Sequence, residues 1–155
     1  MDNNKQIEEY ICENLIDSAK ETALEFVAFL REKGIEFHKD SSPCWRDKIY
    51  YWLKFRDKCV AFVAIKDPDE PDHLWTVWSD DSTAFCQGDM EAELKDIAWK
   101  YIDFCDHCGS CSGGRKKTIF GKDFDGVCGC TFRIDNPDRG DLPFMKKMVE
   151  VCMEQ

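Results

Sequence analysis

The sequence predicts an α+β fold in which helices pack against an antiparallel sheet of about four to five strands. Three observations lead to this class. Apolar residues recur at helical spacing near both ends of the chain, and short runs rich in aromatic and β-branched residues fill the middle. Turn-like polar segments separate those runs. Helices before and after a series of strands are typical of α+β proteins rather than of parallel doubly wound sheets.

Two helices are expected at the N-terminal end. The first, over residues 5–15, carries four apolar residues at helical spacing: Ile7, Tyr10, Ile11 and Leu15. The second is expected to open with a capping box formed by Ser18 and Glu21. It should end at Gly34, because glycine readily adopts the left-handed conformation that closes many helices.

Four strands are predicted next, as an antiparallel meander over residues 35–38, 48–55, 59–65 and 74–79. In the second of these, the odd-numbered residues share one face of the sheet, and Tyr50, Trp52 and Lys54 share the other. The third is apolar on both faces, so it is expected to be central.

The C-terminal part is expected to return to helix. After a loop over residues 80–88, a helix capped by Asp89 should run to Phe104 and deliver the chain to a cysteine-rich loop. A strand follows at about residues 129–134. Asp141 and Pro143 then open a last helix. The chain of 155 residues should form a single domain, residues 1–155.

Five of the ten cysteines lie within residues 105–130, which we predict to be a metal-binding subregion. A two-residue gap followed by glycine lets a tight turn direct two thiolates at one ion, as in zinc knuckles. Four thiolates can then close a tetrahedral site. The predicted ligands are Cys105, Cys108, Cys111 and Cys128, with Cys130 as an alternative ligand in place of Cys111 or Cys128 and His107 as a less favoured substitute for one thiolate.

Zinc is the metal that these spacings favour, and a [4Fe–4S] cluster is the alternative, because three cysteines at C-x-x-C-x-x-C with a distant fourth are also typical of such clusters. The proline that follows the remote ligand in bacterial ferredoxins is missing, and Cys128-Gly-Cys130 resembles a second zinc knuckle. A reversible disulfide, Cys105–Cys108 or Cys108–Cys111, is a further alternative. Cys12, Cys59 and Cys152 lie on apolar faces and are expected to be buried thiols.

Two other groups of residues are candidate binding sites. The strand aromatics are too numerous for one helical layer to cover both faces, so a pocket for a small molecule is predicted to be lined by Tyr50, Trp52, Trp75 and Trp78. The basic run of Arg115, Lys116 and Lys117 follows a glycine pair and could bind an anion. Its alternative role is to offset the negative charge of a four-thiolate site.

The formal net charge of −10 argues against binding to nucleic acid or to an anionic membrane, because such a surface repels phosphate groups. No leader peptide or membrane span is recognisable, so a cytoplasmic protein with reduced thiols is expected. Motifs of serine hydrolases, zinc proteases and zinc deaminases are missing from the sequence.

The block CDHCGSC followed by KKTIFGKDFDGVCG, with the motifs at 78–81 (WSDD) and 93–100 (E-x-x-x-I-A-W-K), resembles a family of small uncharacterised bacterial proteins over most of residues 20–150. That family implies no activity. The N-terminal helices followed by an aromatic meander are similar in outline to YjbR-like or effector-binding α+β domains. We therefore expect a non-enzymatic module that binds a small molecule or a protein. The alternatives are an iron–sulfur protein for redox or electron transfer, and an enzyme that uses the aromatic pocket.

Overall fold

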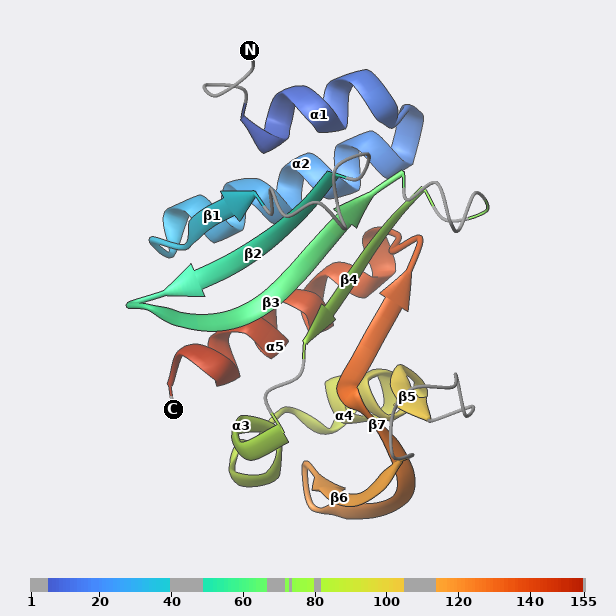
Figure 1. Cartoon of the computed structure of the whole chain (residues 1–155). Helices are drawn as coiled ribbons and strands as arrows, with labels where there is room; N and C mark the ends of the chain where they lie inside the picture. Colours follow the sequence, from blue (N-terminus) through green and yellow to red (C-terminus); the bar gives the residue numbers. More distant parts are fainter. Residues whose placement is uncertain are drawn as a thin grey trace.

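The computed structural model describes residues 6–39, 49–66, 72, 74–79, 82–104 and 114–154, except for the side chains of residues 82, 83, 87, 129 and 130 (Figure 1). Its elements in chain order are α1 (Ile7–Asn14), α2 (Asp17–Glu32), β1 (Glu36–Lys39), β2 (Ile49–Phe55), β3 (Lys58–Ile65), β4 (Trp75–Ser79), α3 (Ser82–Gln87), α4 (Ala92–Lys100), β5 (Ile102–Phe104), β6 (Arg115–Ile119), β7 (Lys122–Asp135), the 3-10 helix η2 (Arg139–Asp141) and α5 (Leu142–Met153).

The strands form one sheet in the order β1-β2-β3-β4-β7-β5, and β6 pairs with β7 outside this path. Each of these pairings is antiparallel. The predicted α+β class with an antiparallel sheet is therefore confirmed. The described residues contain seven strands, more than the four to five that the sequence predicts.

The predicted meander is confirmed, since β1 to β4 follow one another in the sheet as they do in the chain. β3 lies between β2 and β4, and six of its residues, Val60 to Ile65, are buried, in keeping with its predicted central place. Arg56 and Asp57 link β2 to β3 with φ angles of 51° and 68°. Two successive residues at positive φ are the conformation that a tight, right-twisted hairpin requires.

Both N-terminal helices are present, and one capping prediction is wrong. α2 begins at Asp17, with Ile16 at the cap position, and so Ser18 and Glu21 do not form the predicted capping box. A reciprocal cap instead opens α1, where the backbone N–H of Gln6 donates to Oε2 of Glu9 at 3.1 Å. Gly34 follows α2 with a φ of +80°, as its predicted role requires.

The predicted helix over residues 89–104 is wrong at both ends. α4 starts at Ala92 and stops at Lys100, after which residues 102–104 form β5. Ile102 follows Ala98 at helical spacing, which made the longer helix plausible from sequence. Pairing with β7 opposite Phe132 takes Ile102 into the sheet instead, and its side chain is buried there.

Two more elements differ from the sequence prediction. α3 occupies part of the expected loop at residues 80–88. β7 begins at Lys122 rather than near residue 129, because its first half forms a hairpin with β6. The turn of that hairpin has positive φ at Phe120 and Gly121, 48° and 85°. β6 is rich in lysine and arginine, so it lacks the apolar alternation that predicts a strand.

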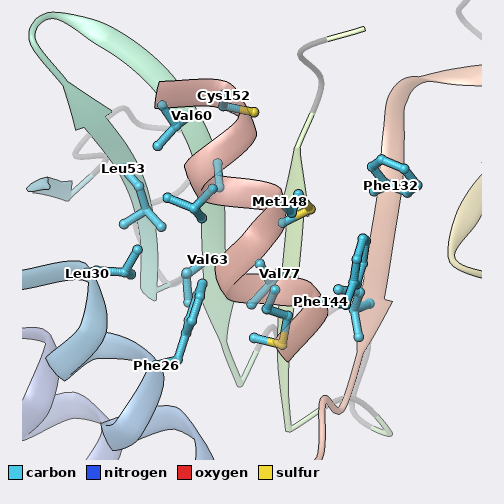
Figure 2. Packing of buried hydrophobic residues seen from close by; sticks show 14 of the residues in the cluster. Phe26, Leu30, Leu53, Val60, Val63, Val77, Phe132, Phe144, Met148 and Cys152 are labelled. Atoms are coloured by element: carbon cyan, nitrogen blue, oxygen red, sulfur yellow. The ribbon is translucent and has the colours of Figure 1, made fainter. Parts of the chain in front are cut away.

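One face of the sheet carries the main hydrophobic core, and the helices cover this face (Figure 1). The core contains buried residues of all five α-helices together with inward residues of the strands. Figure 2 shows how α5 contributes, with Phe144, Met148 and Cys152 directed at the strands. The predicted last helix is thus confirmed, and its apolar stripe holds it across the sheet.

Candidate metal centre and aromatic face

Cys128 lies in the middle of β7, at a point where three strands meet. Its neighbour Val127 pairs with Phe104 of β5 on one side and with Arg115 of β6 on the other. Val127 is 1% exposed, whereas Cys128 is half-buried. Because side chains alternate along a strand, Cys128 projects from the face opposite to Val127.

The segment that carries the other three predicted ligands, residues 105–113, is flanked by residues that lie at this point. It leaves the described chain after Phe104 and rejoins it at Gly114, next to Arg115. The backbone of Gly114 lies against that of Gly126, because a Cβ atom built on Gly114 would be only 2.4 Å from the carbonyl carbon of Gly126. No other residue type fits at Gly114 without moving that backbone.

The predicted ligands divide into one that the structure describes and several that it does not. Cys105, Cys108 and Cys111, like His107, lie outside the described residues, and Cys130 belongs to β7 with an undescribed side chain. Among the described residues, no three His, Cys, Asp or Glu side chains are grouped to hold a metal ion. The four-cysteine site therefore stays a prediction.

The three cations of the basic run next to Cys128 differ in exposure. Arg115 and Lys116 are exposed. Lys117 is half-buried and reaches across the hairpin, where its ammonium Nζ donates to the carbonyl oxygen of Cys128 at 3.1 Å and to the hydroxyl of Thr131 at 2.8 Å. Of the three cations predicted to bind an anion, Lys117 is thus directed at the strand that carries Cys128.

Thr131 has an unusual backbone conformation for its residue type. Its φ angle is +62°, and it is fully buried beside a bulge in the pairing of β7 with β4. A left-handed conformation is costly for a β-branched residue and persists only where surrounding contacts impose it. This strained position comes directly after the Cys128-Gly-Cys130 sequence.

The structure also describes four cysteines outside the predicted metal site, and they differ in burial. Cys152 is buried in the core, as predicted. Cys59 is half-buried on the other face of the sheet. Cys12 is exposed on α1, so its prediction as a buried thiol is wrong, and Cys86 is exposed on α3.

A second, smaller hydrophobic cluster lies on the face of the sheet opposite to the main core. The strand register places Trp52 beside Phe62, and Phe62 beside Trp78. The ring centroids of both pairs are 5.4 Å apart, and Tyr50 packs edge-on against Trp78 at 5.2 Å. Among the described residues, this cluster consists of strand residues alone. We call Tyr50, Trp52, Phe62 and Trp78 the aromatic face.

The sequence prediction found part of this face. Tyr50, Trp52 and Trp78 belong to it, but Trp75 lies on the opposite side, where it is 2% exposed and packs against Phe26 of α2. Phe62 was missed, because β3 is apolar at nearly every position and its alternation is hidden. Trp52 is the most open of the four rings, at 38% exposed.

A surface pocket in the described part of the chain lies elsewhere. It has a volume of about 300 Å³ and is lined by Lys33, Phe55, Arg56, Glu150, Met153 and Glu154. Two of these lining residues, Lys33 and Glu150, form an ion pair at 3.3 Å. None of the four residues predicted to line a ligand pocket borders this one.

In the described ranges, no helix combines the length and the apolar character needed to cross a membrane. Comparison of the chain with protein-family models, with curated proteins and with solved structures gives no match. The resemblance of the cysteine block to a bacterial family therefore remains a prediction. The candidate sites have to be judged from their own geometry.

Proposed function

We propose that this protein is a binding module in which a structural zinc ion, bound to Cys105, Cys108, Cys111 and Cys128, stabilises the hairpin of β6 and β7. We call this hairpin the C-terminal hairpin. One observation carries this proposal. Phe104 and Arg115, on either side of the segment with the first three cysteines, both pair with Val127, the residue that precedes Cys128. Because both flanking residues are anchored beside Val127, a short segment between them would let its cysteines reach the fourth.

The C-terminal hairpin is also less well packed at one end than at the other, and a metal link would stabilise that end. Its turn end is anchored by Ile119 and Phe120, which are both buried. At its open end, the described residues 115–118 of β6 are exposed or half-buried, so burial contributes little there. Metal-binding energy becomes folding energy when the ligands come together only in the folded state. Val127 of β7 is buried at this end, so a zinc site at residues 105–111 and Cys128 would add its energy on the side of β6, where apolar contacts are few.

The experiment is to measure bound metal after purification of cysteine variants. Cys108→Ser and Cys128→Ser are expected to lose zinc, because a closed site with one ligand fewer binds zinc much more weakly. Cys12→Ser, which changes an exposed thiol on α1, is the matched control and should keep the wild-type metal content. Metal content that is indifferent to Cys108 and Cys128 would contradict the proposal.

The aromatic face supports a role in binding. Antiparallel sheets with helices on one side usually present polar residues on the other, so a cluster of four aromatic rings there is unusual. Tyr50 and Phe62 are buried, at 8% exposed each, and Trp78 is half-buried, so Trp52 is the ring of the aromatic face that reaches the surface. Trp52 is open enough to contact a ligand, and the ammonium of Lys54 lies 5.8 Å from its ring centroid. The partner that fits best is a small molecule or a protein segment that offers a flat apolar group.

A further inference from the structure

The surface pocket described above is formed by residues at the ends of α2 and α5 and at the turn between β2 and β3. It is lined by Lys33, Phe55, Arg56, Glu150, Met153 and Glu154. Its volume of about 300 Å³ suits a small ligand, since ligand pockets span about 300–1,000 Å³. None of its lining residues belongs to the proposed zinc site or to the aromatic face. We call it the helix-end pocket.

The charges at the end of α5 oppose the dipole of that helix. Glu150 and Glu154 lie four residues apart at its C-terminal end, and the last turn contains no basic residue. Carboxylates are unfavourable beside the partial negative charge of a helix C-terminus, and like charges four residues apart repel. Lys33 offsets Glu150 through the ion pair at 3.3 Å. Among the described residues, no ion pair includes Glu154, which is exposed, so a positive charge is still favoured there.

Arg56 contributes the complementary group to this pocket. Its φ angle of 51° is left-handed, a conformation that glycine and asparagine adopt more readily than arginine. Its guanidinium lies 5.0 Å from the ring centroid of Phe55, and this contact supports the charged group at the pocket. No ion pair of Arg56 is present within the described ranges. A guanidinium in this position can donate two parallel hydrogen bonds to a carboxylate.

The other two lining residues are apolar. Phe55 and Met153 are both half-buried, so each presents part of its side chain to the pocket. An apolar group that covers them is removed from water together with them, which favours binding. The four charged lining residues, two cations and two carboxylates, sum to zero. The pocket therefore matches a small ligand without net charge that carries a carboxylate, an ammonium group and a short apolar side chain.

We propose that the helix-end pocket binds a free α-amino acid with an apolar side chain. The ligand carboxylate accepts hydrogen bonds from the guanidinium of Arg56, and the ligand ammonium donates to the carboxylate of Glu154. The apolar side chain of the ligand lies against Phe55 and Met153. This site is independent of the proposed zinc site, because the two have no residue in common.

The test is an NMR titration of the isotope-labelled full chain with L-leucine. L-leucine is expected to shift the backbone amide signals of residues 55–56 and 153–154. Isocaproate lacks the amino group and isoamylamine lacks the carboxylate, so each should bind about ten-fold or more weakly than L-leucine. Glycine, which lacks the apolar side chain, should also bind more weakly. Signals that do not move, shifts confined to other parts of the chain, or equal affinity for L-leucine and either analogue would overturn the proposal.

Two variants test the assigned roles of the charged residues. Arg56→Gln and Glu154→Gln should each raise the Kd for L-leucine by about ten-fold, because each loses one charge-assisted contact. Arg115→Gln and Glu93→Gln remove the same charges at exposed positions outside the pocket, and both should keep the wild-type affinity. If Arg56→Gln does not fold, Arg56→Lys takes its place, since it keeps the charge, loses the planar fork and should still weaken binding. Wild-type affinity in the pocket variants contradicts the proposal.

Discussion

Arg31 shows how a single side chain joins several elements. Its guanidinium donates to both carboxylate oxygens of Glu8 on α1, at 2.5 and 2.8 Å, and lies 4.7 Å from the ring centroid of Phe37 on β1. The hydrogen bonds from Arg31 hold the pKa of Glu8 below its ordinary value, against the opposing effect of burial. The pair therefore links α1 to α2, and its contribution depends on pH.

The sign of that dependence follows from the lowered pKa. A carboxylate with a lower pKa in the folded state stabilises the fold above its unfolded pKa of about 4.3, and this stabilisation is lost as the pH falls through the folded value. Glu8→Gln should therefore lower the free energy of unfolding by about 0.2–1 kcal/mol at neutral pH, as for exposed ion pairs. Near the acid limit, the variant and the wild type should converge.

Urea unfolding at neutral and at acid pH measures both values, with Glu32→Gln on the exposed surface of α2 as the control. A stability difference between Glu8→Gln and wild type that persists unchanged at acid pH would mean that the ion pair is not its source. This ion pair could not be predicted from the sequence, because Glu8 and Arg31 are far apart in the chain and meet only when α1 packs on α2.

At the scale of elements, the periodicity of the sequence located α1, α2, α5 and the four strands of the meander. Periodicity gave the wrong element where pairing with a strand distant in sequence overrode the local pattern. Residues 102–104 continue a helical pattern, yet they pair with β7. β6 has no apolar alternation and becomes a strand because β7 lies beside it. Trp75 and Trp78 are three residues apart, and so alternation places them on opposite faces of β4.

The aromatic face predicts a contrast between Trp52 and a core residue. Trp52→Ala should cost much less stability than Phe26→Ala, whose loss from the core should cost about 3–5 kcal/mol. Trp52→Ala should also abolish the increase in Tm that wild type shows with hits from a small-molecule thermal-shift screen, because ligands stabilise only the state that binds them.

Phe104→Ala is the matched control for that screen, since Phe104 is an aromatic residue 51% exposed outside the aromatic face. The hits should still stabilise this variant. A screen without hits, or hits that stabilise Trp52→Ala as much as wild type, would remove the aromatic face as a binding surface for small molecules.

At the scale of the whole molecule, the predicted class followed from the order of helical and strand patterns, while the place of β7 between β4 and β5 did not. That place depends on pairings between residues far apart in sequence, such as Val77 with Ile134. For the candidate metal centre, too, one part could be predicted from the sequence and another could not. The cysteine spacing is local and could be read directly, but the hydrogen bond from Lys117 to the carbonyl oxygen of Cys128 depends on the register of β6 and β7.

The metal content of the anaerobically purified wild-type protein tests the central claim most directly. Elemental analysis combined with a visible absorption spectrum distinguishes the two metals that suit a four-cysteine site. A colourless protein with stoichiometric zinc is the predicted result. A brown protein that contains iron and sulfide, or one without bound metal, would contradict the claim that a structural zinc ion holds the C-terminal hairpin.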